Sequence, residues 1–238
     1  MPTDAPLRIV LTGASQGLGL EFTRLWLEAG HHVFAMARSA TRSAGLADLA
    51  GQYSDALHLQ DVDVADDDSV SRAAEEVEKR SAALDLLLNN AGIYNVHGGS
   101  MTDLDFADWR HHMEVNALGP IRVARSFLPL LRRGNEARVI NMTSLMGSIA
   151  DNGSGGSWAY RMSKTALNMA SRNMGHELAR EGIPAVAIHP GWVQTDMGGA
   201  AAPLSIEEAV ASMAATMDRF TVEQSGGFYD RHGEPMPW

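Results

Sequence analysis

Short runs of apolar residues alternate along this chain with longer segments in which apolar residues recur at helical spacing. The apolar runs show no strict alternation with polar residues, which is typical of parallel strands buried on both faces. They lie at Leu7–Leu11, Val33–Ala37, Leu57–Val62, Leu84–Leu88, Val139–Met142 and Ala185–Ile188. The pattern therefore predicts the strands of a covered parallel sheet.

The longer segments predict amphipathic helices between these strands. The first carries apolar residues from Leu18 to Ala29 and ends at Gly30, a residue that favours helix termination. Further helices are expected at Asp66–Leu84, Leu104–Leu131, Ala159–Arg180 and Ile206–Arg219. Alternating strands and helices with right-handed crossovers predict one α/β domain over residues 1–238.

Composition removes several classes of protein. The 238 residues include no cysteine, which excludes disulfides, thiolate metal sites and a cysteine nucleophile. The chain carries 19 basic and 29 acidic residues, and its net charge of -10 disfavours a nucleic-acid partner. No apolar run has the length of a membrane span and the start does not resemble a signal peptide, so we expect a cytoplasmic protein with no membrane partner.

Four strand ends carry residues suited to ligand binding, and the carboxyl ends of parallel strands meet at one edge of a sheet. The first strand is followed by TGASQGLG, which leads into a helix. Its glycines allow a pyrophosphate to approach the N–H groups of the helix N-terminus. The spacing G-x-x-x-G-x-G departs from the usual G-x-G-x-x-G, and a tight turn is the alternative. The residues predicted to bind a dinucleotide here are Thr12, Gly13, Ser15, Gln16, Gly17, Leu18 and Gly19.

The end of the second strand indicates which dinucleotide binds. NAD-binding folds place an acidic residue near this point for the ribose 2′-hydroxyl, whereas an arginine accommodates a 2′-phosphate. Arg38 stands there with no acidic neighbour, which favours NADP(H) and leaves NAD(H) possible; a surface arginine is the alternative. Asp63 and Val64 follow the third strand and are placed to border the adenine, unless Asp63 only caps a helix.

Tyr160 and Lys164 are four residues apart and share one face of a predicted helix. A tyrosine ordinarily titrates near pH 10, so a cation one turn away is expected to stabilise the phenolate and lower its pKa. Ser144, at the end of the fifth strand, is placed to donate to a substrate carbonyl while Tyr160 protonates it. A surface pair is the alternative interpretation of Y-x-x-x-K taken alone.

Six motifs in sequence order resemble the short-chain dehydrogenase/reductase family over nearly the whole chain: TGASQGLG, NNAG, VNALGP, NMTS, YRMSK and PGWVQTDM. The resemblance implies a Rossmann-type doubly wound parallel sheet of about seven strands in the order 3-2-1-4-5-6-7, whose last strand is Gly227–Asp230. Ser144, Tyr160 and Lys164 would then be catalytic. Asn116 would be the fourth catalytic member, holding a water that relays protons.

The same resemblance implies contacts with the cofactor and with other copies of the chain. Asn90, Ala91 and Gly92 would border the adenine ribose, and Pro190, Gly191, Val193 and Thr195 would border the nicotinamide. Family members commonly pair through the two long helices, so a homodimer or homotetramer is expected. The adjacent histidines His31-His32 and His111-His112 lack the spacing of metal ligands, so no metal is predicted.

Longer segments, among them HPGWVQTDMGGAAAPLS and GGFYDRHGEPMPW, resemble the sniffer and C-factor-like carbonyl reductase branch of that family. This implies reversible hydride transfer between NADP(H) and a small-molecule carbonyl or secondary alcohol. A cofactor-binding signalling protein is one alternative. A 3-oxoacyl-thioester reductase is another, although it would need a basic patch for an acidic carrier protein, and the charge of -10 gives no sign of one.

The position of the catalytic serine is the main departure from the family pattern. Ser144 precedes Tyr160 by 16 residues, a few more than in most members, and Ser148 is the rival at 12. Ser144 is preferred because it follows the strand directly and because the insertion Asn152–Ser157 is glycine-rich and loop-like. Several large side chains beside these motifs predict either an apolar substrate pocket or core packing: Tyr94, Met146, Trp158, Trp192 and Met197.

Overall fold

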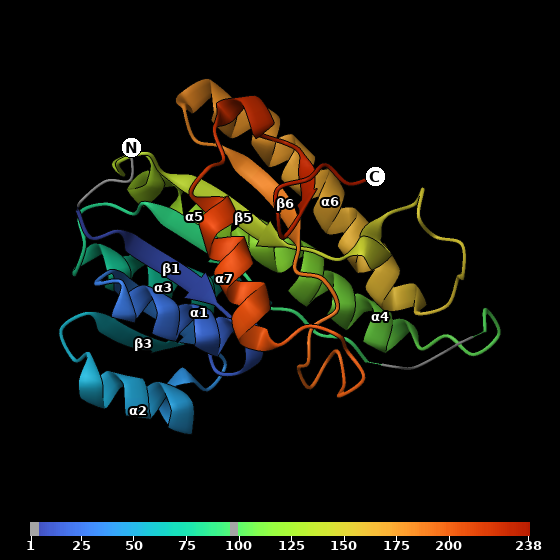
Figure 1. Cartoon of the computed structure of the whole chain (residues 1–238), viewed down its shortest axis with the longest axis horizontal. Helices are drawn as coiled ribbons and strands as arrows, with labels where there is room; N and C mark the ends of the chain where they lie inside the picture. Colours follow the sequence, from blue (N-terminus) through green and yellow to red (C-terminus); the bar gives the residue numbers. More distant parts are fainter. Residues whose placement is uncertain (1–4, 96–99) are drawn as a thin grey trace.

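The computed structural model describes residues 5–95 and 100–238, and its centre is one parallel sheet of seven strands. The strands are β1 (Arg8–Thr12), β2 (His32–Ala37), β3 (Leu57–Asp61), β4 (Leu86–Asn89), β5 (Arg138–Met142), β6 (Ala185–His189) and β7 (Phe228–Asp230). Their order across the sheet is β3-β2-β1-β4-β5-β6-β7 (Figure 1). The predicted fold class and strand order are therefore confirmed.

The register of the strands brings the predicted ligand-binding residues to one edge. In the ladder Leu11 pairs with Leu88, Asn89 with Asn141 and Met142 with Ile188, all in parallel. The residues that follow β1, β4, β5 and β6 consequently leave the sheet side by side. This is the edge at which open α/β sheets bind ligands.

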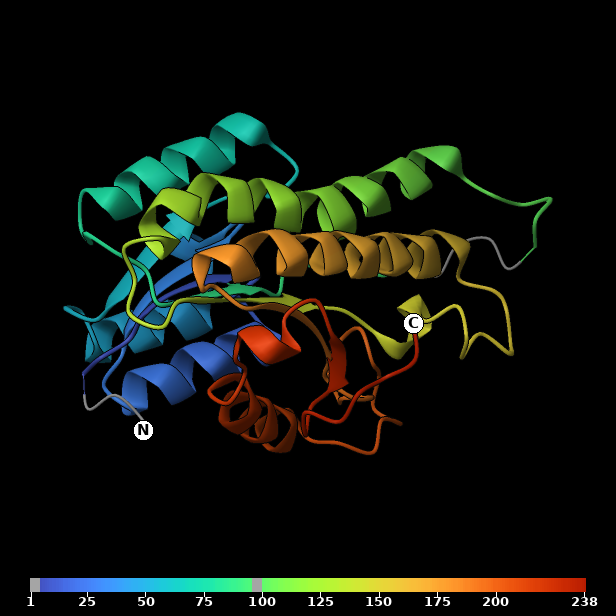
Figure 2. The same ribbon diagram turned by 90° about the horizontal axis from the view of Figure 1, so that it is seen from above.

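Helices cover both faces of the sheet in two layers (Figure 2). One layer contains α1 (Gly17–Glu28), α2 (Ala44–Gln52) and α7 (Ile206–Met217), and the other contains α3 (Asp67–Glu78), α4 (Phe106–Met113), α5 (Gly119–Leu131) and α6 (Trp158–Leu178). Each layer packs on one face of the sheet and forms an apolar core with it. Phe22 is fully buried in the first core and Phe127 in the second. Burying such a side chain stabilises the fold by roughly 1.5–3 kcal/mol.

The long helix expected at Leu104–Leu131 is the main difference from the predicted elements. It begins at Phe106 and contains a π-helical turn, η2 (Glu114–Leu118), before α5. Pro120 explains the interruption, because it has no N–H to donate to the carbonyl of Asn116 and its ring would clash with that carbonyl in a regular helix. The wider turn relieves the clash and falls at the asparagine that the resemblance marks as catalytic.

The remaining differences are small. The helix expected at Asp66–Leu84 is shorter, ending at Glu78, and α2 has no counterpart among the predicted helices because its apolar pattern spans only nine residues. No helix within the two described ranges is long and apolar enough to cross a bilayer.

Candidate active site

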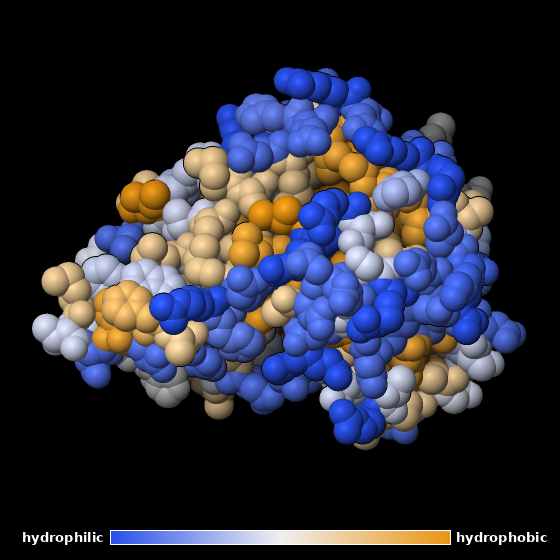
Figure 3. All heavy atoms as spheres, turned by 180° about the vertical axis from the view of Figure 1, so that it is seen from behind, coloured by the Kyte–Doolittle hydropathy of each residue, from blue (hydrophilic) through white to orange (hydrophobic). Residues whose placement is uncertain are grey.

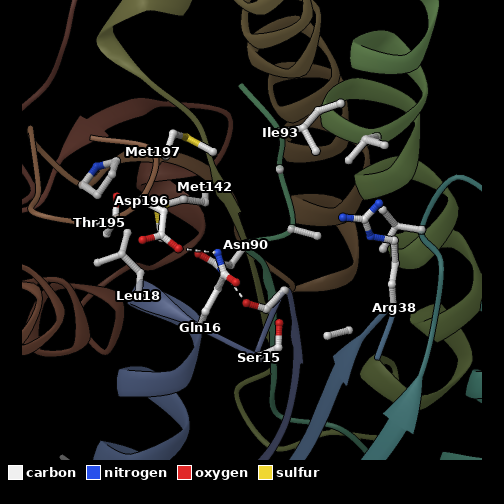
Figure 4. A pocket seen from close by; sticks show the side chains of 18 of the residues that line it. Ser15, Gln16, Leu18, Arg38, Asn90, Ile93, Met142, Thr195, Asp196 and Met197 are labelled. Atoms are coloured by element: carbon white, nitrogen blue, oxygen red, sulfur yellow. Dashed lines mark hydrogen bonds between the residues drawn. The ribbon is translucent and has the colours of Figure 1, made fainter. Parts of the chain in front are cut away.

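A cavity of about 960 Å³ opens at the carboxyl edge of the sheet (Figure 4). Most of the residues predicted to bind a cofactor line it: Gly13, Ser15, Gln16, Gly17, Leu18, Arg38, Asp63, Val64, Asn90, Ala91, Gly92, Tyr160, Lys164, Pro190 and Thr195. Four others, namely Thr12, Gly19, Gly191 and Val193, are not among the lining residues. Most of the predicted cofactor residues therefore line one continuous wall of the cavity, although they come from segments far apart in the chain.

Thr12 and Gly19 do not line the cavity, but they fix the conformation of the glycine-rich loop. Thr12 Oγ1 accepts hydrogen bonds from the N–H groups of Asn90 and Ala91, both at 3.1 Å, and so joins the ends of β1 and β4. A Cβ on Gly19 would lie 2.1 Å from the carbonyl oxygen of Gly13, so only glycine allows α1 to begin so close to the loop. Their role in this structure is to hold the loop, not to border the cavity.

The start of α1 has the character of an anion site. Gln16, its N-cap residue, makes no side-chain capping hydrogen bond, and the first turn contains no acidic residue. Gly13 and Gly17 have φ angles of 70° and 53°, a backbone conformation that glycine adopts without strain. Backbone N–H groups at a helix N-terminus in this setting suit a phosphate.

Arg38 lies at the far side of the cavity from Thr195 and Met197 (Figure 4). It follows β2 directly and is exposed, so its guanidinium is available to a ligand in the cavity. Nearby, Asp63 lines the cavity while its carboxylate accepts a hydrogen bond of 2.9 Å from the N–H of Ala65. Asp63 therefore fixes a turn at the border of the cavity, and the helix-cap alternative is wrong, because Asp66 is the N-cap residue of α3.

Ser144, Tyr160 and Lys164 converge at the other end. Ser144 follows β5 by two residues and its side chain accepts a hydrogen bond of 3.1 Å from the N–H of Met146. Lys164 is buried, and its Nζ donates to the carbonyl of Met142 at 2.9 Å and lies 5.8 Å from the centre of the Tyr160 ring. Tyr160 and Lys164 line this corner of the cavity, and Ser144 is buried near Tyr160 without being among the lining residues.

Burial dominates the electrostatics of this corner. It raises the pKa of Tyr160 to about 12, against a lowering by the hydrogen bond with Ser144. Burial also lowers the pKa of Lys164 to about 8. The expected lowering of the tyrosine pKa by the lysine is therefore not what the chain alone produces. The cause is the burial of the phenol, which has the largest influence on its pKa.

Asn116 is fully buried and joins three segments. Its Nδ2 donates to the carbonyl of Ile93 at 2.9 Å and to Ser163 Oγ at 3.0 Å, and its Oδ1 accepts from the N–H of Ile93 at 2.8 Å. The side chain is not among the residues that line the cavity. It ties the loop after β4 to α6, which carries Tyr160.

Ser148, the rival serine, has a different environment. Its Oγ accepts a hydrogen bond of 3.0 Å from the N–H of Asp151, and it is buried outside the set of residues that line the cavity. It therefore fixes the turn at the start of the insertion. Ser144 is likewise absent from the lining residues, but of the two serines it is the one whose hydroxyl lowers the pKa of Tyr160.

The predicted substrate-pocket residues divide into two groups. Met197 lines the cavity, with its sulfur 3.9 Å from Tyr160 Oη, and the ring of Tyr94 packs 4.7 Å from the ring of Tyr160. Trp192 is largely exposed, and its Nε1 donates to the carbonyl of Gly198 at 2.8 Å. Met146 and Trp158 are half-buried, and like Tyr94 and Trp192 they are not among the residues that line the cavity.

Several lining residues escaped the sequence analysis. Met142 and Thr143 border the cavity from the end of β5, and Asp196 accepts a hydrogen bond of 3.2 Å from Gln16 Nε2 across the cleft (Figure 4). The first two could have been found, because they directly precede Ser144 at the same strand end. The contact of Gln16 with Asp196 joins loops 180 residues apart, and no local pattern predicts it. Within the described residues, no three His, Asp or Glu side chains are grouped to hold a metal ion.

Comparison with known proteins defines the class of this site. Residues 8–203 match the family model of the short chain dehydrogenases, so the chain belongs to the short-chain dehydrogenase family. Its structure is similar to the carbonyl reductase Sniffer of D. melanogaster, with a TM-score of 0.94 and 32% identity over 98% of this chain and all of that chain. The protein is therefore an oxidoreductase that acts on a carbonyl or alcohol group.

Two further relatives specify the branch. The NADPH-bound carbonyl reductase from chicken fatty liver has a TM-score of 0.90 and 31% identity, covering 98% of this chain and 99% of that chain. The C-signal of Myxococcus xanthus is 48% identical over 155 residues, which are 65% of this chain and 93% of that protein. These similarities confirm the predicted sniffer and C-factor-like branch.

Proposed function

We propose that the protein reduces a small-molecule ketone or aldehyde with NADPH, in a reversible reaction. The observation that carries this proposal is the placement of Tyr160 and Lys164 at one end of a cavity whose other end carries Arg38, with the Ser144 hydroxyl close enough to Tyr160 to lower its pKa. The cavity residues fit a dinucleotide, since the glycine-rich loop leads into a helix N-terminus with no acidic residue in its first turn. The bound cofactor supplies the hydride for this chemistry.

The chain's own side chains bind and protonate the reacting carbonyl. Ser144 donates a hydrogen bond to the carbonyl oxygen, and Tyr160 donates its proton to that oxygen as negative charge develops there. At neutral pH the phenol of Tyr160 is protonated, and because its pKa is raised to about 12 its proton moves only as negative charge develops on the carbonyl oxygen. Lys164 binds the ribose hydroxyls and holds a positive charge beside the tyrosine.

Proton resupply falls to the segment around Asn116. Pro120 cannot donate to the carbonyl of Asn116, and we assign the relay water to that carbonyl. The side-chain bonds of Asn116 to Ile93 and Ser163 fix that turn in place. Asn116 thus acts through its backbone, with its side chain as an anchor.

Preference for NADP(H) over NAD(H) is assigned to Arg38. An arginine pairs with the doubly charged 2′-phosphate, and no acidic side chain adjoins Arg38 at the end of β2 to repel it. The NADPH-bound relative from chicken supports this preference.

Turnover of NADPH with a panel of aliphatic and aromatic carbonyls tests the proposal. We expect loss of NADPH absorbance with at least one carbonyl class, abolished in Tyr160→Phe, while cofactor binding persists in that variant. Absence of turnover with every carbonyl, together with tight NADPH binding, would instead favour the second candidate, a cofactor-binding signalling protein. The 48% identity with the C-signal is the observation that supports that candidate.

We also propose that two copies associate through the face formed by α5 and α6. Figure 3 views this side of the molecule and shows apolar surface between hydrophilic side chains. Leu118 and Ile121 are exposed there. Ile121→Glu is expected to shift the protein from dimer or tetramer to monomer in sedimentation, and an unchanged mass would contradict this assembly.

A further inference from the structure

Met197 is the side chain that faces the Tyr160 hydroxyl from the loop after β6. Its sulfur lies 3.9 Å from Tyr160 Oη and accepts a weak hydrogen bond from it. The side chain lines the cavity and is 44% exposed, so reagents in solution can reach its sulfur. A soft thioether therefore occupies the space in which a substrate carbonyl oxygen must sit.

The backbone around Met197 is held firmly in place. The hydroxyl of Thr195 accepts from the N–H of Gly198 at 3.0 Å, and the indole of Trp192 donates to the carbonyl of Gly198 at 2.8 Å. On the other side, Asp196 accepts a hydrogen bond from Gln16 across the cleft. These hydrogen bonds fix the loop that carries Met197. A chemical change at the Met197 sulfur therefore alters its contact with the hydroxyl of Tyr160.

We propose that Met197 is an oxidation site through which a hydroperoxide inactivates the enzyme. The inference rests on the proposed function. The sulfur lone pair attacks the terminal oxygen of the hydroperoxide, an S–O bond forms and the O–O bond breaks. The thioether is oxidised by two electrons to a sulfoxide. Hydrogen peroxide is reduced to water, and an organic hydroperoxide is reduced to its alcohol; the proton of the transferred oxygen moves to the departing oxygen.

The oxygen of the sulfoxide resembles the carbonyl oxygen of the substrate as a hydrogen-bond acceptor. Its oxygen is a strong acceptor, unlike the thioether sulfur, and it extends from the sulfur toward Tyr160 Oη into the range of an O–H···O hydrogen bond. The oxidised side chain therefore takes the Tyr160 donor that the carbonyl oxygen needs, and it competes with the substrate for that donor.

The test compares the wild type with Met197→Leu and with a matched control, Met162→Leu. Met162 is 47% exposed and lies on α6, so it is as accessible as Met197, which is 44% exposed. Each protein is treated with hydrogen peroxide, oxidation of every methionine is followed by peptide mass spectrometry, and the ratio of treated to untreated kcat/KM is measured. Methionine sulfoxide reductase is then added to each treated sample.

We expect treated wild type and Met162→Leu to lose kcat/KM by more than about tenfold, in step with oxidation of Met197. Met197→Leu should keep its own untreated value, and the reductase should restore the wild type. Full oxidation of Met197 with unchanged kcat/KM would overturn the inference, as would equal loss in Met197→Leu. Untreated wild type without any turnover contradicts the proposed function instead.

A second readout does not depend on turnover. If the sulfoxide bonds to Tyr160, oxidation should lower the melting temperature less in the wild type than in Tyr160→Phe, where the donor is missing. An equal decrease in the two proteins would show that the sulfoxide and the phenol do not interact, and this would overturn the inference whatever the activity.

Discussion

The hydroxyl of Tyr94 lies 3.0 Å from Ser157 Oγ, and this contact joins the loop after β4 to the residue that precedes α6. Ser157 has a φ angle of 44°, in the left-handed region that residues other than glycine rarely adopt. The ring of Tyr94 packs at 4.7 Å against that of Tyr160. Ser157, in its strained backbone conformation, therefore anchors the ring of Tyr94, which packs against Tyr160, the proposed proton donor.

We expect Tyr94→Phe to keep this ring contact but lose the anchor. The less firmly held phenol should lower kcat by about two- to tenfold, with NADPH affinity unchanged. Steady-state kinetics with fluorescence titration of NADPH checks this. An unchanged kcat would mean that packing alone orients Tyr160.

Ser157 separates the hydrogen bond from the backbone strain. Ser157→Ala loses the hydroxyl and keeps the strain, whereas Ser157→Gly loses the hydroxyl and removes the strain, which costs about 1–2 kcal/mol for an L-residue. Ser157→Gly should therefore be the more stable of the two in urea unfolding. Both should share the kinetic defect of Tyr94→Phe, and equal stability would argue against strain at this position.

The proposed preference for NADP(H) assigns the 2′-phosphate to the exposed guanidinium of Arg38. We expect Arg38→Asp to weaken NADPH binding at least tenfold, about 1.4 kcal/mol, and to improve NADH relative to NADPH. Arg42→Asp is the matched control, since its guanidinium is also exposed but bonds to Ser39 Oγ at 3.1 Å. Titration of both cofactors in the three proteins would contradict the assignment if Arg38→Asp showed no change in their ratio.

The burial of Lys164 leads to a prediction about pH and stability. Its pKa is lowered to about 8 in the folded chain, against 10.5 in the unfolded one. The unfolded state therefore binds more protons between these values, so the lysine costs stability at neutral pH and that cost disappears as pH rises above 8. Lys164→Met should accordingly raise the free energy of unfolding at pH 7 by about 1–3 kcal/mol.

The catalytic activity should fall over the pH range in which the stability rises. The wild-type kcat/KM for NADPH, which reports ionisations in the free enzyme, should fall as pH rises through about 8, when Lys164 loses its charge. Lys164→Arg stays protonated, so its alkaline limb should move upward although its activity is low. A wild-type profile that is flat up to pH 10, far past the value of about 8, would contradict this assignment.

Sequence patterns were sufficient for the sheet and for most of the cavity wall, because both follow from local signals. Buried strands such as Val33–Ala37 are apolar on both faces, and residues such as Arg38 inherit their position from the strand that they follow. The π-helical turn around Asn116 was not predicted, since it arises from a proline that still fits a helical pattern. Nor was the high pKa of Tyr160, because burial is a property of the assembled cavity and not of the spacing to Lys164.

The choice between the two serines gives the sharpest mutational test. The Ser144 hydroxyl lies close enough to Tyr160 to lower its pKa, whereas Ser148 Oγ accepts from the N–H of Asp151 and fixes the turn before the insertion. Loss of a donor aimed at a developing oxyanion costs about 10²–10³ in turnover. We expect Ser144→Ala to lose that much kcat with NADPH binding intact.

Ser148→Ala should instead lower stability, since the N–H of Asp151 loses its partner, at a cost of about 1 kcal/mol. Its kcat should fall by less than about tenfold. Measuring kcat, NADPH affinity and urea unfolding for both variants separates the two roles. A crippled kcat in Ser148→Ala with normal turnover in Ser144→Ala would transfer the proposed oxyanion role to Ser148, against the geometry of the strand end.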